Sequence, residues 1–218
     1  ETVSLCYSMK ANPFFVPAMI TCVDKLEVCS PGELTICKKL GVDASRIIYS
    51  GVNKEIPDIK EAYEYGVGTF TAESVRQADL IQQVVETAAA GEKAEVILRL
   101  NSGSQFGMSK EDLLTILQCR ESRYTSLNFT GIHYFVGTQR KRAKRKIKEL
   151  QMLLELFEEI RNKCGLKLKK LEYGPVFAVP YFEDDDFEDT LYPVKELKDT
   201  LKQVAQQVDL TIEMGRLF

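Results

Sequence analysis

Ionisable, hydroxyl-bearing and small residues lie at the ends of apolar, strand-like runs at eight places along the chain. A lysine amine at such a place can act as a nucleophile, and arginines and glycines there can bind an anion. If the runs form a parallel barrel, their carboxyl ends meet on one rim and these residues converge. They are Lys10, Glu27 to Ser30, Ser50-Gly51, Thr71 to Glu73, Arg99 with Asn101, Phe135 to Thr138, Gly174, and Glu213 with Gly215-Arg216. The set suits an anionic ligand that also needs a nucleophilic amine.

The elements that would position these residues alternate regularly. Eight strand-like runs alternate with seven helical patterns, which predicts an α/β fold, a (β/α)8 TIM-type barrel. Most runs are continuous apolar stretches, typical of parallel strands covered on both faces. We expect strands at residues 3–9, 25–29, 46–50, 68–71, 94–100, 128–136, 168–173 and 210–214. We expect helices at residues 13–23, 30–40, 55–65, 72–90, 109–120, 139–164 and 193–208.

Capping residues mark several helix ends. Ser30, Pro31 and Glu33 form the pattern of a capping box at the start of one helix, and Gly41 marks its end. No helical pattern follows the last run, and the chain lacks an initiator Met. We therefore expect residues 1–218 to be one barrel domain cut from a longer polypeptide.

Composition narrows the function classes. The formal net charge of −3 gives no global reason to expect nucleic acid as a partner. No apolar run reaches the roughly 20 residues of a membrane span, and no signal peptide is visible. We interpret the six cysteines as reduced cytoplasmic thiols, mostly packed in the core, and the single histidine argues against a zinc site. These observations predict a cytoplasmic protein without a metal, a membrane or a nucleic-acid partner.

The chain contains two clusters of residues of like charge. We interpret the basic cluster at residues 140–148 as a solvated helix face and the acidic cluster at residues 183–189 as an exposed loop. The alternative for the basic cluster is a site for a nucleic-acid backbone.

Five segments, in order, resemble the motifs of the alanine-racemase-like barrel decarboxylases that use pyridoxal 5′-phosphate (PLP), the family of diaminopimelate, ornithine and arginine decarboxylases. The segments are residues 7–13 (YSMKANP), 27–34 (EVCSPGEL), 99–101 with 105–107 (RLN and QFG), 131–139 (GIHYFVGTQ) and 213–216 (EMGR). Each is weak alone, but their order and spacing match over nearly the whole chain. The resemblance implies the N-terminal barrel domain of such an enzyme, without its C-terminal β-domain.

The resemblance assigns the two central roles to opposite ends of the chain. Lys10 would be the catalytic residue that forms the Schiff base with PLP, and Glu213 would pair with the pyridine nitrogen. We expect the two to face each other across a ring-sized gap on one rim. A carboxylate at that nitrogen favours decarboxylation over racemisation, because related racemases place an arginine there. The alternatives are a solvated lysine and a salt bridge from Glu213 to Arg216.

The remaining cofactor contacts follow from the same segments. Gly174, Gly215, Arg216 and Thr138 would hold the phosphate, although the glycines also suit turns and Thr138 also suits a helix cap. Residues near the ring would be Arg99 and Glu27, with Glu33 and His133 in the surrounding shell; a cap and a core position are the alternatives for the last two.

Two departures from the family pattern concern this cofactor site. Phe135 stands where the family has a histidine that stacks on the PLP ring, so it can stack but cannot hydrogen-bond. Pro175 and Val176 stand in a segment that is usually Gly-Gly-Gly-Phe, and proline offers no N–H to a phosphate. These changes suggest either a divergent subfamily or a protein without catalysis.

The expected function is therefore PLP-dependent decarboxylation of an amino acid, most like that of diaminopimelate decarboxylase. The isolated barrel is expected to be inactive, because in the family a C-terminal domain completes the site across a homodimer. The alternatives are a non-catalytic homologue that binds or regulates a partner, an amino-acid racemase on the same barrel, and a nucleic-acid binder that uses the basic cluster.

Overall fold

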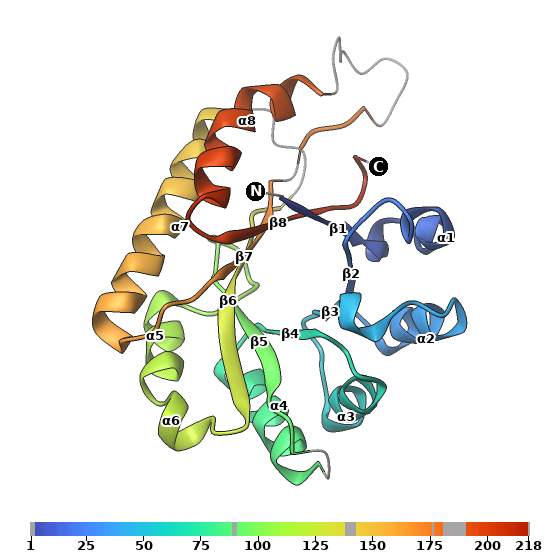
Figure 1. Ribbon diagram of the computed structural model, residues 1–218, viewed down its shortest axis with the longest axis vertical. Coiled ribbons are helices and arrows are strands. Elements are labelled where there is room, and N and C mark those ends of the chain that lie inside the picture. The colour runs from blue at the N-terminus through green and yellow to red at the C-terminus, as the bar shows by residue number, and fades with distance from the viewer. Residues whose placement is uncertain (1–2, 89–90, 138–142, 176, 181–190, 218) are drawn as a thin grey trace.

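Eight parallel strands close into a barrel in the computed structural model, which describes residues 3–88, 91–137, 143–175, 177–180 and 191–217 (Figure 1). Neighbouring strands follow sequence order around the barrel, from the first to the eighth. The strands are β1 (Ser4–Ser8), β2 (Lys25–Val28), β3 (Ile47–Tyr49), β4 (Thr69–Ala72), β5 (Ala94–Arg99), β6 (Leu127–Phe135), β7 (Lys170–Gly174) and β8 (Asp209–Met214). The predicted barrel is confirmed, with each strand within a few residues of its expected bounds.

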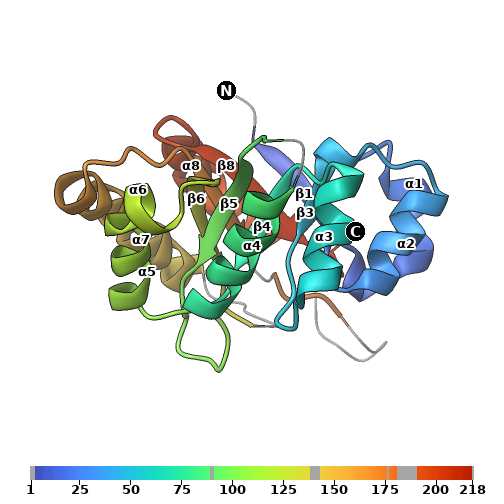
Figure 2. The ribbon, with the colours of Figure 1, turned by 90° about the horizontal axis from the view of Figure 1, so that it is seen from below.

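The helices form an outer layer around the strands (Figures 1 and 2). They are α1 (Val16–Met19), α2 (Pro31–Lys39), α3 (Ile56–Tyr65), α4 (Val75–Thr87), α5 (Lys110–Gln118), α6 (Arg120–Arg123), α7 (Ala143–Cys164) and α8 (Tyr192–Ala205). Short 3-10 turns accompany them; within the described residues these are η1 (Met9–Ala11), η2 (Pro13–Phe15) and η3 (Ala44–Arg46).

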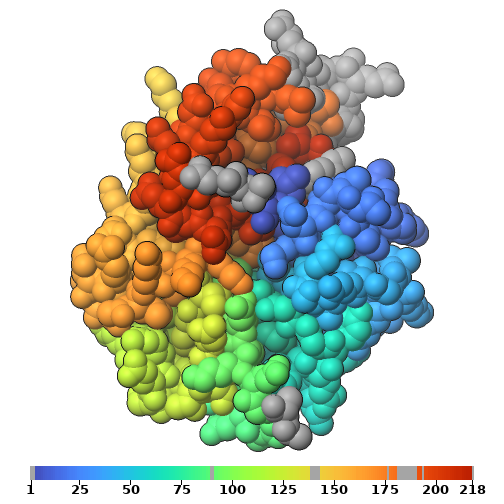
Figure 3. All heavy atoms as spheres, viewed as in Figure 1, coloured from blue at the N-terminus to red at the C-terminus, as the bar shows by residue number. Residues whose placement is uncertain are grey.

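The barrel closes where the first and last strands pair. β1 pairs with β8 in parallel, and Cys6 lies opposite Glu213 in the register. Figure 3 shows the corresponding first and last segments of the chain, in blue and red, meeting on one face. This pairing brings the ends of two strands that are about 200 residues apart in sequence to the same rim, and the hydrogen bond between Lys10 and Glu213 spans 203 residues.

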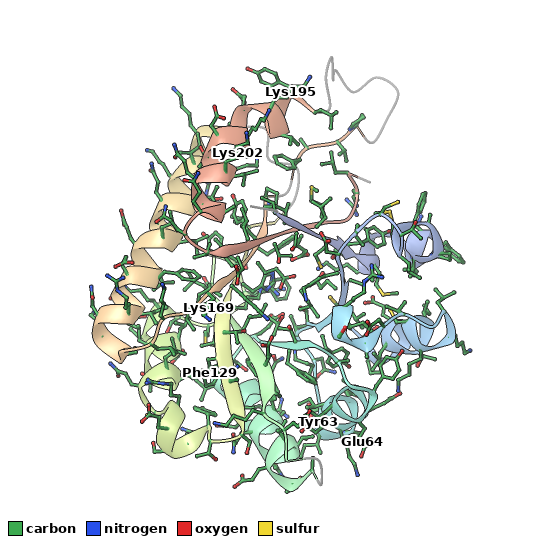
Figure 4. The ribbon with its side chains drawn as sticks, in the orientation of Figure 1. Tyr63, Glu64, Phe129, Lys169, Lys195 and Lys202 are labelled. Atoms are coloured by element: carbon green, nitrogen blue, oxygen red, sulfur yellow. The ribbon has the colours of Figure 1, made fainter. Side chains whose placement is uncertain are left out.

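The strands alternate between an apolar outer face and a more polar inner face. Tyr7, Leu26, Tyr173 and Ile212 belong to the large buried cluster that includes the helices. Since side chains alternate along a strand, their neighbours point into the barrel, where Figure 4 shows side chains crowding the space between the strands. β8 is therefore one of the strands that are not continuously apolar, because the barrel interior holds ionisable groups.

Local capping explains where α2 begins. The Ser30 hydroxyl accepts a hydrogen bond from the Glu33 amide N–H, as the sequence predicts. The Glu33 carboxylate, however, accepts from the Cys29 N–H at 2.6 Å, one residue earlier than a standard capping box requires. This bond ties the end of β2 to the first turn of α2.

Several helices are shorter than the sequence predicts, and two of them show the reason clearly. The helix expected at residues 13–23 becomes η2 followed by the short α1, because Pro17 lacks the N–H that a continuous helix would use. The helix expected at residues 72–90 begins only at Val75, since β4 extends through Ala72 and Ser74 caps the helix.

The cysteines and the charge clusters differ partly from expectation. All six cysteines are free thiols, but only Cys6 and Cys37 are fully buried, so the prediction of mostly core cysteines is wrong. In the basic cluster Lys144 and Arg145 are exposed, whereas Lys146 is buried and lies over the Phe177 ring at 5.4 Å. The acidic cluster at residues 183–189 lies outside the described residues.

Candidate active site

Lys10 lies in the turn η1 immediately after β1, at the rim where the strands end. Its Nζ atom lies 2.7 Å from Oε2 of Glu27 and 3.3 Å from Oε1 of Glu213. The two carboxylates are 2% and 1% exposed, whereas 44% of the Lys10 side chain is exposed. The amine therefore sits over a buried acidic pair, while the side chain that carries it is partly exposed.

The contact between Lys10 and Glu213 differs from the expected arrangement in one respect. Both groups lie on the same rim, as predicted, but they form a direct ion pair and not a gap the size of an aromatic ring. A lysine side chain has a flexible four-carbon stem. Rotation of this exposed stem would open a space between the amine and the carboxylate.

The charges around Lys10 determine its protonation. Burial lowers the pKa of Lys10, but Glu213 and Glu27 raise it more strongly, and the net result is a pKa well above the usual value for lysine. Ser8 adds a hydroxyl on the inner face of β1 and donates to the same Glu27 oxygen that contacts the amine. The amine is thus a cation held by two carboxylates.

Glu213 is held by a second partner besides Lys10. Its Oε2 atom lies 3.0 Å from Nε2 of His133, and both side chains are fully buried. Burial raises the pKa of Glu213, but the charge of Lys10 and the hydrogen bond to His133 outweigh it, so the pKa lies well below the usual value. Glu213 is therefore ionised. Lys10, just after β1, and His133, on β6, hold its carboxylate in place.

Arg99 and Phe135 form the opposite side of the rim. Arg99 makes a salt bridge of 2.6 Å to Glu73, which follows β4. Its guanidinium carbon lies 5.9 Å from the centre of the Phe135 ring, and the Lys10 amine lies 5.2 Å from the same centre. Both distances fall within the range of cation–π attraction. The Phe135 ring thus lies beside the two cations of the rim.

Packing against Phe135 explains why residue 174 is a glycine. A Cβ atom placed on Gly174 would come within 2.4 Å of Cδ2 of Phe135, so the ring lies directly against the glycine. The space over the glycine is filled by Phe135, and Pro175 next to it has no N–H. The expected phosphate role of Gly174 stays a prediction.

Gly215 and Arg216 lie at a hollow beside the ends of β1 and β8. The hollow has a volume of about 570 Å³ and is lined by Tyr7, Ala11, Asn12, Phe15, Val179, Pro180, Gly215 and Arg216. A Cβ atom on Gly215 would lie 2.6 Å from Cβ of Ala11, so only glycine lets the two strand ends come together here. Thr138, the other residue expected to bind phosphate, lies outside the described residues.

Glu33 and Cys29 connect the site to α2. The Glu33 carboxylate is held by the Cys29 N–H, and burial is the main cause of its raised pKa. The Cys29 sulfur lies 3.9 Å from the Lys10 amine. Glu33 therefore fixes the residue that lies next to the amine, and its role in a cofactor site stays a prediction.

Several residues of the site have no role in the sequence prediction. Glu73, which pairs with Arg99, is one of the predicted strand-end residues, but the family resemblance assigns it no function. Lys54 is buried, its amine donates to the Gly51 carbonyl at 2.5 Å, and burial lowers its pKa to about 8. Glu172 on β7 is fully buried inside the barrel. Strict alternation along β7, with an acid two residues before Gly174, is the signal that would have placed Glu172 inside.

A parallel barrel with a lysine amine and two buried carboxylates at the carboxyl ends of its strands is typical of an enzyme that handles a carbonyl group through an amine. The chain belongs to the family described as pyridoxal-dependent decarboxylase, pyridoxal binding domain, whose model matches residues 1–218. The family resemblance of the five sequence segments is thereby confirmed. PLP is the cofactor of this family.

Individual relatives agree with this assignment. The chain is 28% identical over 210 residues to L-glutamyl-[BtrI acyl-carrier protein] decarboxylase of Niallia circulans, covering 88% of this chain and 48% of the relative. It is 26% identical over 230 residues to diaminopimelate decarboxylase of Aquifex aeolicus, covering 97% and 53%. Among solved structures, SrLDC in complex with PLP and cadaverine has a TM-score of 0.84 and 26% identity, covering 99% of this chain and 55% of that chain.

The chain spans about half the length of the curated relatives it matches. In the described part of the chain, none of the helices has the length and apolar character that crossing a membrane requires.

Proposed function

We propose that this chain holds PLP through the Lys10 amine and serves the decarboxylation of an amino acid. The observation that carries the proposal is the cluster at the rim, in which Lys10 contacts both Glu27 and Glu213. Membership of the pyridoxal-dependent decarboxylases supports the cofactor and the class of reaction.

The donor set fits PLP. The cofactor needs an amine for its aldehyde, an acidic partner for its ring nitrogen and an anion site for its phosphate. Lys10 offers the amine, and Glu213 offers a carboxylate that is ionised and fixed by His133. Gly215 and Arg216 line the hollow beside these groups and would hold the phosphate. When bound, PLP supplies an electron-accepting ring for the electron pair that remains after loss of the substrate carboxylate.

Each neighbour of the amine would have a definite task. Glu27 would orient Lys10 by accepting a hydrogen bond from its amine. The Ser8 hydroxyl, which donates to the same oxygen, would hold Glu27 in place when the charge of the amine changes. Phe135 would give the cofactor ring an apolar face, and Arg99 would stay fixed by Glu73 at the edge of the site. A carboxylate rather than an arginine at position 213 favours decarboxylation over racemisation, because it keeps the ring nitrogen protonated.

The substrate is proposed only as a class. The relatives act on diaminopimelate and on a glutamyl group carried by a protein, so we propose an amino acid or aminoacyl group with a free α-carboxylate. The homodimer and the cytoplasmic location remain predictions.

A second candidate function is a homologue without catalysis. The observation in its favour is the Phe135 ring against Gly174, next to Pro175, in the segment expected to bind phosphate. Such a protein would keep the barrel and lose the tight phosphate contact.

Absorbance spectroscopy separates the two candidates. On addition of PLP to the 218-residue chain, we expect a new band near the edge of the visible range, which Lys10→Ala abolishes and Lys60→Ala retains. Lys60 is a suitable control because its side chain is 65% exposed on α3. Identical spectra for the wild type and Lys10→Ala would contradict the proposal. Release of CO2 from diaminopimelate, lysine or ornithine by the longest natural form of the protein would exclude the non-catalytic candidate.

A further inference from the structure

Glu172 is a buried carboxyl group that the proposed function does not use. It lies on the inner face of β7, is 3% exposed, and neither of its carboxylate oxygens has a hydrogen-bond partner among the described residues. A buried polar group without a partner is costly, so each such group in a structure calls for an explanation.

A second orphaned atom lies on the neighbouring strand. His133 is paired with Glu172 in the register of β6 and β7, so both side chains point to the same face of the sheet from adjacent positions. The Nε2 atom of His133 contacts Glu213, but its Nδ1 atom is buried without a partner in the described part of the chain. One ring nitrogen of His133 therefore contacts Glu213, and the other is left for a partner on the same face of the sheet, where Glu172 lies.

Glu172, His133 and Glu213 thus form a row of three side chains inside the barrel, with His133 in the middle. We propose that Glu172 is a carboxylic acid that donates its proton to Nδ1 of His133, so that the imidazole keeps its proton on Nε2 and presents it to Glu213. This bond requires the Glu172 side chain to rotate toward the neighbouring strand, and it would satisfy both orphaned groups at once. Glu172 is then a positioning residue that acts on Glu213 through His133. The consequence for PLP rests on the proposed function.

The surrounding charges favour the protonated form of Glu172. The groups that face it are Cys6 on β1, Lys10 after β1, Glu27 on β2, His133 on β6 and Glu213 on β8. Glu27 and Glu213 already place two carboxylates against the Lys10 amine, and a third buried carboxylate beside them would add to their mutual repulsion. Burial is the largest cause of the rise in the pKa of Glu172 to about 8.

The state of His133 follows from this assignment. Burial lowers the pKa of His133, but the hydrogen bond to Glu213 and the negative charges of Glu172 and Glu213 outweigh it, so that the net shift of the pKa is upward. With Glu172 protonated, its contribution to that rise disappears. A neutral imidazole between an acid and a carboxylate needs no additional buried charge.

The single histidine of the chain makes a direct test possible. Labelling with 15N-histidine reports only on His133, without any assignment step, in protein free of PLP. At pH 7 we expect Nε2 to be protonated and Nδ1 to be an unprotonated acceptor. Glu172→Gln should retain this tautomer because its amide N–H can donate, whereas Glu172→Leu should shift the tautomer ratio by about tenfold, the size of one buried hydrogen bond.

Two results would overturn the proposal. One is a protonated Nδ1 in the wild type at pH 7, and this measurement needs no variant to fold. The other is a spectrum of Glu172→Leu that matches that of the wild type. Because PLP is absent, these outcomes are independent of whether the chain binds the cofactor, which the absorbance experiment tests separately.

Discussion

At the scale of single residues, the site consists of charges that hold one another in place. Lys10 is fixed by two carboxylates, and Glu213 is fixed by Lys10 and His133. The sequence indicated Lys10 and Glu213 because Lys10 directly follows the first predicted strand and Glu213 lies near the carboxyl end of the last one. It did not assign a role to Glu172 or Glu73, because a role depends on which face of a strand a residue occupies and which charge lies opposite. That information requires the register between strands.

The raised pKa of Glu172 predicts a pH-dependent stability. The folded chain keeps this proton to about pH 8, whereas the ordinary pKa of glutamate is 4.5. Between these values the folded state binds more protons than the unfolded state, so the free energy of unfolding falls as the pH rises, by up to about 1.4 kcal/mol per pH unit. Glu172→Gln cannot titrate and should become progressively more stable than the wild type from pH 5 to pH 8.

Urea unfolding at several pH values measures this difference. Glu64→Gln is the control, since Glu64 is 63% exposed on α3, where Figure 4 labels it. Its difference from the wild type should stay nearly constant with pH. A constant difference for Glu172→Gln as well would mean that Glu172 is ionised at neutral pH.

At the scale of elements, the ends of β6 and β7 fit together through one glycine. Gly174→Ala would bring a methyl group within 2.4 Å of the Phe135 ring, and the ring must shift. We expect the free energy of unfolding to fall by about 1–3 kcal/mol, the usual cost of overpacking. Phe135→Leu should recover part of this loss, and a double-mutant cycle in urea measures the coupling.

The control for this prediction is Gly32→Ala in the first turn of α2. A Cβ atom there meets nothing closer than 3.9 Å, so the substitution should be neutral or slightly stabilising. Additive effects of Gly174→Ala and Phe135→Leu would show that the two residues do not share the space that the structure assigns to them.

The elements themselves differ in how well the sequence predicts them. The strands were found because each carries large apolar residues on its outer face, which pack under the helices. The helix expected at residues 13–23 was too long because its apolar pattern continues past Pro17, where backbone hydrogen bonding cannot. The capping pattern of α2 was recognised, but the partner of Glu33 depends on how β2 ends, which the pattern does not specify.

At the scale of the whole molecule, the barrel brings together residues from both ends of the chain. The pairing of β1 with β8 closes the barrel and places Lys10 against Glu213. A ligand held at this junction stabilises the closed barrel, because it binds the folded state alone.

PLP should therefore raise the thermal stability of the chain. At a concentration of about 100 times its dissociation constant, a ligand adds about 2.7 kcal/mol, which corresponds to roughly 5–10 °C in Tm for a chain of this size. Differential scanning calorimetry should show this rise for the wild type and for Lys60→Ala, and a much smaller one for Lys10→Ala. An equal rise in Tm for all three proteins would mean that PLP binds at a place other than Lys10.

The most direct test of the account is to locate the attached cofactor. The chain is mixed with PLP, reduced with sodium borohydride, digested and analysed by mass spectrometry. The account predicts that the pyridoxyl adduct is concentrated on the peptide that contains Lys10, at a level far above that of any exposed lysine, and that excess inorganic phosphate reduces it. An adduct spread evenly over surface lysines, with none enriched at Lys10, would contradict the assignment of the site.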